Sequence, residues 1–433
     1  MGSRLKWLYP GMRVKRWLLV MAAGVICVGV GTNLAAGVEL FALLQQWFVR
    51  PIARLVGTLP QQATLPLGAL TFGLGLVLIA VGYRQTIRSL VAVIMPGETD
   101  KLPDLVFERR YLRRGPRIVA IGGGTGLSTL LRGLKAYTSN ITAIVTTADD
   151  GGSSGRLRSE LGIPAPGDIR NTLVALADTE PLMERLFQYR FEEGHGLKGH
   201  SFGNLFIAAM TEVTGDFERA IRESSKVLAI RGRVLPSTLE SVVLSAEYED
   251  GTSTQGESAI PAQRKRIRRV YLMPEDARPL DEALEAIRSA DGIVLGPGSL
   301  YTSVIPSLLV EGIAQAVRES RATKMFVCNV MTQPGETDGY TGYDHVKAIV
   351  DHFGSGLIDY AILNREAPPA ETLRRYEKEG AVPVVCDADR IAAMGIVPVV
   401  EDLIDESDLA RHNSERLAQV VIEIMSQTYP HLR

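Results

Sequence analysis

The stretch RIVAIGGGTGLSTLLRGL, residues 117–134, joins a short apolar run to three consecutive glycines and a second apolar segment. The first run is rich in β-branched residues and predicts a buried strand. Beyond Gly126, leucines recur at positions 127, 130, 131 and 134, which is the spacing of one helical face. The stretch therefore predicts a strand, a glycine turn and a helix, the opening unit of an α/β fold.

The glycine turn has two interpretations. It is either a tight turn, or a place where the backbone lies close to a ligand phosphate at a helix N-terminus, and we favour the second. The spacing is not the Rossmann pattern G-x-G-x-x-G, because Leu127 and Thr129 stand where a third glycine would fall, and no Lys-Ser/Thr pair makes a Walker A loop. The predicted phosphate-binding residues are Gly122, Gly123, Gly124, Thr125 and Gly126.

Composition narrows the class of protein. The chain has 433 residues, of which 46% are hydrophobic, so it can bury a full core with room for more than one domain. A formal charge of −2 gives no general field for polyanions, so we do not expect nucleic acid as a partner. The three cysteines have no paired spacing, which favours a reducing compartment over a cysteine zinc site.

The first hundred residues differ from the rest. Residues 17–38 and 63–83 are long and apolar enough to cross a bilayer, and a signal peptide is disfavoured because the first run is too long and a second follows. Basic residues flank the outer ends of the pair, so both termini are expected in the cytoplasm of a multi-pass protein of the cell membrane. We expect a membrane hairpin over 1–94, a linker over 95–115 and a cytosolic domain over 116–433.

From residue 116 onward, β-branched runs alternate with helical patterns. Buried parallel strands are expected at 117–122, 141–148, 291–296, 324–331, 358–364 and 382–387, and helices at 127–137, 169–178, 203–212, 217–228, 280–289, 303–319 and 344–353. The fold class is therefore α/β, with a doubly wound, mostly parallel, Rossmann-like sheet and flanking helices. Ligands of such sheets bind at the carboxyl ends of the strands.

The loops after these strands carry polar residues. Asp149 and Asp150 lead into GGSSGRLR, and either acid could bind a ribose hydroxyl or a divalent metal, orient an attacking hydroxyl, or form an ordinary Asp-Gly turn. Asp168 either caps a helix or faces the ligand together with Arg170 and Asn171. In GHSFGNL, His200 has a structural or a ligand-binding interpretation.

A later loop, LGPGSLYTS, again joins a strand to a helix. Its backbone amides, hydroxyls and aromatic ring suit a phosphorylated group attached to a ring, and the predicted contacts are Gly296, Gly298, Ser299, Tyr301 and Thr302. NVMTQPGETDGY then places Asn329, Thr332, Gln333 and Glu336 after the following strand. Several such loops predict one extended, phosphate-rich ligand.

In order, AIGGGTGLSTLLRGLK, ITAIVTTADDGGSSGRLR, IPAPGDIRN, LFQYRF, GHSFGNL, LGPGSLYTSV and NVMTQPGETDGY resemble the gluconeogenesis factor family, within the 2-phospho-L-lactate transferase-like group. The resemblance covers residue 117 to the C-terminus. It implies a regulator of cell shape and envelope synthesis on gluconeogenic carbon that binds a UDP-sugar of the UDP-N-acetylglucosamine type. Its implied ligand contacts are the loop 122–126, Asp149, Asp150, Asn171, Asn204, Tyr301 and Thr302.

The N-terminal hairpin departs from the typical member of this family, which starts near the glycine turn, and it suggests a membrane-tethered regulator. The alternative is an enzyme of the transferase type, in which Asp149 or Asp150 is catalytic and holds Mg²⁺. The partners implied are a nucleotide sugar and proteins of envelope synthesis or its regulation, and a homo-oligomer is left open.

Overall fold

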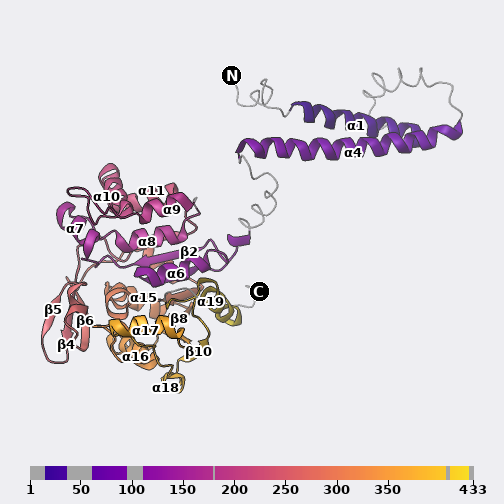
Figure 1. Ribbon diagram of the computed structural model, residues 1–433. Helices are drawn as coiled ribbons and strands as arrows, with labels where there is room; N and C mark the ends of the chain where they lie inside the picture. The colour runs from indigo at the N-terminus through magenta and orange to yellow at the C-terminus, as the bar shows by residue number, and fades with distance from the viewer. Residues whose placement is uncertain (1–14, 37–60, 95–110, 179–180, 406–409, 429–433) are drawn as a thin grey trace. The chain divides into compact units, whose positions relative to one another are not determined.

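The computed structural model describes residues 15–36, 61–94, 111–178, 181–405 and 410–428. The chain forms two compact units, Met1–Glu108 and Arg109–Arg433, which are described separately below (Figure 1). Most of the expected linker, residues 95–110, and the end of the first expected span, residues 37–38, lie outside the described residues.

The first unit is a pair of helices, α1 (Lys15–Ala36) and α4 (Gln61–Ile94), packed against each other through glycines. A Cβ atom on Gly24 would lie 2.8 Å from the carbonyl oxygen of Gly75, and one on Gly31 would collide with the backbone of Phe72. Large apolar side chains face outward instead, among them Leu19 at 70% exposed. Small residues inside and apolar residues outside are typical of helices packed in lipid.

One stretch of this unit is long and apolar enough to cross a membrane, the 25 residues Leu65–Ser89 of α4. The apolar part of α1, Arg16–Thr32, is shorter than such a span. The described residues of this unit therefore supply one candidate span where the sequence predicts two.

The second unit is built on a seven-stranded sheet with the order β10-β9-β8-β7-β1-β2-β3, and every neighbouring pair in it is parallel. Its strands are β1 (Ile118–Gly122), β2 (Ile141–Val145), β3 (Arg233–Pro236), β7 (Gly292–Leu295), β8 (Thr323–Val327), β9 (Tyr360–Asn364) and β10 (Val397–Glu401). A second sheet, in the order β5-β4-β6, is antiparallel and comprises β4 (Val243–Tyr248), β5 (Ser253–Gln255) and β6 (Ile267–Met273).

Helices cover both faces of the large sheet, so successive residues of a strand enter opposite cores. Ile118 and Ala120 of β1 belong to one buried cluster, and Val119 and Ile121 belong to the other. The first cluster includes α6 (Gly124–Leu134), α7 (Gly152–Leu161), α8 (Gly167–Leu176), α9 (Pro181–Gln188), α10 (Phe202–Thr214), α11 (Phe217–Val227) and α19 (Ser414–Thr428). The second includes α12 (Ala259–Ala262), α13 (Asp281–Ser289), α14 (Ile305–Leu309), α15 (Ile313–Glu319), α16 (Gly342–Phe353) and α18 (Ala388–Ala392). Burial on both faces explains the continuous apolar runs of these strands.

The α/β class and the parallel sheet are confirmed, but three local predictions are wrong. Residues 382–387 form no strand, and the edge strand is β10 instead. The helix expected over 303–319 is divided into a π-helical turn, Leu300–Val304, then α14 and α15. GGSSGRLR, expected as a loop, lies almost entirely in α7.

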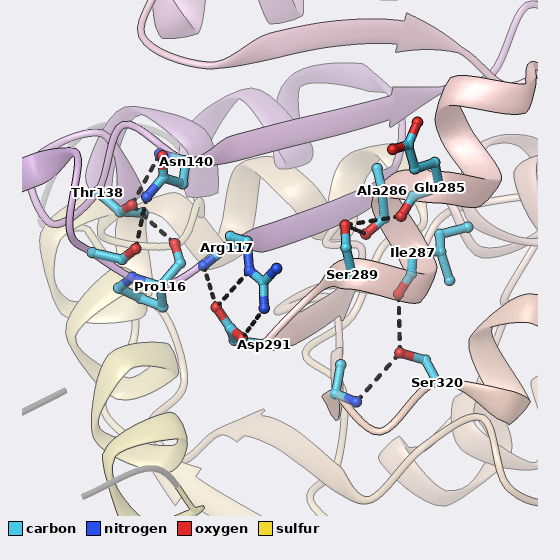
Figure 2. A network of polar contacts seen from close by, with 12 residues as sticks. Pro116, Arg117, Thr138, Asn140, Glu285, Ala286, Ile287, Ser289, Asp291 and Ser320 are labelled. Carbon is cyan, nitrogen blue, oxygen red and sulfur yellow. Dashed lines mark hydrogen bonds and ion pairs between the residues drawn. The ribbon is translucent and has the colours of Figure 1, made fainter. Parts of the chain in front are cut away.

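The amino ends of β1 and β7 are joined by polar contacts (Figure 2). The backbone N–H of Arg117 donates to Asp291 Oδ2 at 2.8 Å, and its guanidinium donates to both oxygens of the same carboxylate. Nearby, the Asn140 side chain donates to the carbonyl of Gly115 at 2.7 Å. These contacts fix the amino edge of the sheet, while the opposite edge carries the glycine loops.

Candidate functional site

The candidate site lies at the carboxyl ends of the central strands. β1 is flanked by β2 on one side and β7 on the other, because the chain passes to β2 and β3 and later returns across β1. The helices that follow β1 and β7, α6 and α14, lie in buried clusters on opposite faces of the sheet, so the carboxyl ends of these two strands form a topological switch point. Open α/β sheets bind their ligands in the crevice at such a point.

The glycines of these two loops allow their backbones to touch. A Cβ on Gly126 would lie 2.7 Å from the carbonyl oxygen of Pro297, and one on Gly298 would lie 2.9 Å from that of Gly123. Gly124 has φ +70°, a left-handed conformation that side chains disfavour. These glycines are therefore required by the contact between the loops and by the turn itself.

Helix α6 begins at this contact without a side-chain cap, because its N-cap residue is Gly123. The Gly124 N–H bonds to Asp168, and the next amides, of Thr125 and Gly126, belong to the first turn, where no intrahelical acceptor is present. Their N–H groups and the helix dipole together favour an anion.

A cleft of about 310 Å³ opens beside the start of α6. One wall is formed by the loops after β1, β7 and β8, and the other by α17 (Ala370–Glu379) and residues 410–412. Its lining residues include Gly124, Thr125, Gly126, Thr129, Gly298, Ser299, Asn329, Met331, Gln333, Tyr376, Glu379, Arg411 and His412. The lining therefore contains residues of both predicted glycine loops, including Ser299 of the second.

Side-chain amides hold the loop after β7 in place. Asn329 accepts from the Gly298 N–H at 3.2 Å and donates to the Gly298 carbonyl at 2.8 Å. Gln333 donates to the Ser299 hydroxyl at 2.7 Å. The loops after β7 and β8 thus form one wall. Asn329 and Gln333, which the sequence marks only as polar residues after a strand, hold the glycine loop in position.

A cluster of acidic side chains lies near the glycine turn, and none of its members lines the cleft, where Glu379 is the acidic residue. The Asp168 carboxylate lies against Gly123, and burial together with the charge of Asp149 raises its pKa to about 6. Burial, with the charges of Asp149 and then Glu336 nearby, raises the pKa of Glu257 to about 8. Burial also raises the pKa of Glu336 to about 7, although Thr302 donates to it. At neutral pH, Glu257 is therefore mostly protonated, Glu336 is about half protonated and Asp168 is mostly ionised.

The predicted aspartates of this cluster are already engaged. Asp149 accepts from the Gly151 N–H at 2.8 Å, and Asp150 accepts from the backbone and hydroxyl of Ser258 at 2.9 and 2.7 Å. The part of the chain that the structure describes contains no group of three or more His, Cys, Asp or Glu side chains arranged to hold a metal ion. These residues do not fit a preformed Mg²⁺ site.

His200 and Asn204 lie farther from the cleft, in a buried polar network. His200 Nδ1 is 3.0 Å from the Ser153 hydroxyl, to which Asn204 donates at 3.1 Å. Burial lowers the pKa of His200. Asn171 accepts from Arg170 at 2.7 Å and bonds to Asp168, so it links this network to the acidic cluster. In this geometry the network orients α7 and α8.

Tyr301 and Thr302 do not line the cleft. The Tyr301 side chain is 2% exposed, and its hydroxyl lies 2.9 Å from that of Tyr340. Tyr301 and Thr302 belong to the π-helical turn Leu300–Val304. Their role as ligand contacts stays a prediction, and the geometry gives them a packing role.

Four residues that matter here were missed from the sequence, namely Glu257, Tyr376, Arg411 and His412. None stands in a glycine motif or directly after a strand of the large sheet, so only the folded chain brings them to the site.

Comparison with known proteins places this geometry in a family. The family model described as 2-phospho-L-lactate transferase CofD matches residues 118–404. A crystal structure of a Bacillus halodurans protein superposes with a TM-score of 0.70 at 55% identity, over 71% of this chain and 100% of that one. The fold and the matched region define the chain as a CofD-like α/β protein.

The relatives narrow the class. The gluconeogenesis factor of Bacillus subtilis is 54% identical over 72% of this chain and 99% of its own length, and that of Halalkalibacterium halodurans is 56% identical over 71% and 95%. The chain belongs to the gluconeogenesis factor family.

The N-terminal segment is not peculiar to this chain. A Nostoc relative is 48% identical over 425 residues, 96% of this chain and 92% of its own, so its match includes most of the first hundred residues. The Bacillus subtilis relative has no room for them, because its 313 matched residues are 99% of its length. The family therefore contains chains with and without the segment.

Proposed function

We propose that the chain binds a nucleotide sugar of the UDP-N-acetylglucosamine type and acts as a regulator that links gluconeogenic carbon to cell shape and envelope synthesis. The observation that carries the binding proposal is the uncapped start of α6, which opens into a cleft at the switch point of the sheet. A diphosphate placed there meets the backbone N–H groups of Thr125 and Gly126, beside the Gly124 N–H that already bonds to Asp168.

The regulator acts at the membrane through its N-terminal hairpin, with both ends cytoplasmic. The apolar stretch Leu65–Ser89 and the outward-facing leucines support a membrane location, and the proposed orientation rests on the basic residues at the outer ends of the pair. The expected partners are proteins of envelope synthesis or its regulation.

The test is calorimetric titration of residues 109–433 with UDP-N-acetylglucosamine, UDP and GDP, with and without Mg²⁺. This part forms a compact unit, and a Bacillus halodurans protein whose whole chain matches 71% of this one has a crystal structure. We expect saturable binding of UDP-N-acetylglucosamine that Thr125→Glu abolishes, because a carboxylate then occupies the anion position, and that Gln263→Glu outside the cleft leaves unchanged. Binding of GDP alone would contradict the proposal.

The enclosed carboxyl of Asp168 favours a second candidate, a phosphoryl-group transferase. A pKa of about 6 beside the glycine turn suits a general base. The test is product formation from a phospholactyl nucleotide and a deazaflavin alcohol. Turnover that Asp168→Asn removes without loss of nucleotide affinity would establish an enzyme, and absence of product leaves the regulator.

A further inference from the structure

A second groove lies along β3, which is the edge strand of the large sheet at the end away from β10. Its volume is about 340 Å³. It is lined by residues of α11 and the turn after it, by Arg233, Val234 and Leu235 of β3, and by Glu282 of α13. None of these residues lines the cleft beside the glycine loops, so the groove is a separate place on the molecule.

The pairing of β3 with β2 leaves the backbone of Val234 facing this groove. In a parallel pair, alternate residues of a strand exchange hydrogen bonds with the neighbouring strand. The Ser237 N–H donates to the Val145 carbonyl at 2.8 Å, and Val145 is opposite Pro236, so the odd-numbered residues of β3 bond to β2. The N–H and C=O groups of Val234 therefore point away from β2.

These two backbone groups have no partner in the part of the chain that the structure describes. Val234 is only 4% exposed, and backbone groups of such buried residues are nearly always hydrogen-bonded. A donor and an acceptor side by side on an edge strand are a template for one more strand. Pro236, the next residue that faces outward, has no N–H, so the template is short.

The side chains beside the template define the chemistry of an added strand. Arg233 and Val234 lie on opposite faces of the sheet, and paired residues of neighbouring strands share a face. Arg233 donates to Thr142 Oγ1 at 3.2 Å, and no described acidic side chain forms an ion pair with it. Val234 lies in the apolar cluster against which Ile230 packs. An added strand should therefore place a carboxylate beside Arg233 and an apolar side chain on the other face.

We propose that the edge of β3 binds an extended segment of a partner protein, in which apolar and acidic residues alternate, as an additional strand of the large sheet. Val234 supplies the backbone pairing, and Arg233 binds the carboxylate. A second copy of this chain is the poorer occupant. Antiparallel pairing of two copies about Val234 would place Leu235 opposite Arg233, and it would supply no carboxylate.

The probe is a fluorescein-labelled peptide amide, Val-Glu-Val-Glu-Val, titrated with residues 109–433 and followed by fluorescence anisotropy. The comparison peptide is Val-Lys-Val-Lys-Val, which keeps the alternation and reverses the charge. We expect the acidic peptide to bind saturably and the basic one at least about tenfold more weakly, because its ammonium groups lie beside Arg233.

Two variants separate the side-chain contact from the backbone contact. Arg233→Gln should weaken binding of the acidic peptide about 5- to 10-fold, and Arg219→Gln, which removes the same charge from an exposed position of α11 outside the groove, should leave it unchanged. Val234→Pro should weaken binding about tenfold, since it removes the outward N–H while the hydrogen bonds with β2 remain. Thermal unfolding of each variant checks the fold.

A peptide with N-methylated valines makes the same test on the unmodified protein, and we expect it to bind at least about tenfold more weakly because it cannot donate to the edge strand. Equal affinity for the acidic and basic peptides, or full affinity for the N-methylated one, would overturn the proposal. So would the absence of saturable binding of the acidic peptide up to about 1 mM. A dimer in light scattering that Val234→Pro dissociates would assign the edge to a second copy and would also overturn it.

Discussion

Replacing Glu257 with Gln should change how the stability of the second unit depends on pH. The native pKa of Glu257, about 8, lies above its ordinary value of 4.5, so the native state retains a proton that the unfolded chain loses. The associated stability is fully present below pH 4.5 and is lost as the pH rises through 8. Glutamine cannot ionise and avoids that loss.

The magnitude follows from the shift. A rise in pKa from 4.5 to about 8 corresponds to about 5 kcal/mol at roughly 1.4 kcal/mol per unit. Glu257 keeps partial contact with solvent and its acidic neighbours Asp168 and Glu336 also take up protons, so we expect about 2–3 kcal/mol. The variant should equal the unmodified protein at pH 4.5 and exceed it by this amount at pH 9.

The assay is urea unfolding of residues 109–433 between pH 4.5 and 9, with Glu377→Gln on the exposed face of α17 as the control. The control removes one negative charge without touching the cluster. Parallel pH profiles for Glu257→Gln and the unmodified protein would refute the reasoning, because they would show that Glu257 ionises as freely as a surface residue.

Two further changes test packing. Tyr301→Phe should lower the free energy of unfolding by about 1 kcal/mol, since it removes the hydroxyl contact with Tyr340 and keeps the buried ring. If the variant keeps its affinity for UDP-N-acetylglucosamine, Tyr301 serves packing. If that affinity is lost, Tyr301 is the predicted ligand contact. Gly31→Val should separate α1 from α4, because the added side chain meets the backbone of Phe72. The control is Gly73→Val, whose side chain points into open space. We expect limited proteolysis of the first unit in detergent to become roughly tenfold faster in Gly31→Val and to stay unchanged in the control.

The sheet was predictable wherever a strand and its following loop carried the information together. The stretch 117–134 contains both the alternation of strand and helix and the turn between them. β1 lies where the sequence predicts it, and α6 begins at Gly124 rather than at Leu127, so part of the predicted glycine turn is the first turn of the helix. The same holds for β7 and the glycines after it.

One tetrapeptide occurs twice in the chain and has a different secondary structure in each place. Val-Pro-Val-Val occurs at 382–385 and again at 397–400, but only the second copy forms a strand, at the sheet edge where a proline is tolerated. The first copy instead exchanges hydrogen bonds with the segment after β8, as Val384 donates to Val330 at 2.9 Å. This pairing holds Val330 in place, which lines the cleft. Tertiary pairing assigns the two copies, and no property of the tetrapeptide does.

The sequence also does not predict that these acidic residues come together in a cluster. Glu257 follows β5 of the small antiparallel sheet, and the neighbouring Ser258 is joined to Asp150 across 108 positions of the chain. Sequence spacing gives no sign of that contact, although it marks the adjacent aspartates. The pKa shifts of the cluster are therefore a property of the fold.

The glycines that first suggest a phosphate site turn out to have local causes. Gly123 is crowded by Asp168, and Gly126 is crowded by Pro297. A Cβ on Gly124 would meet only Ser303 Oγ, at 4.0 Å, so the reason for that glycine is its positive φ and not a lack of space. Protein contacts therefore explain these three glycines without any ligand. The case for an anion rests on the amides of Thr125 and Gly126 in the first turn of α6 and on the exposed guanidinium of Arg411, which lines the same cleft. Removing the guanidinium is accordingly a more direct test of the ligand than replacing a glycine, because glycine variants break the loop contact as well.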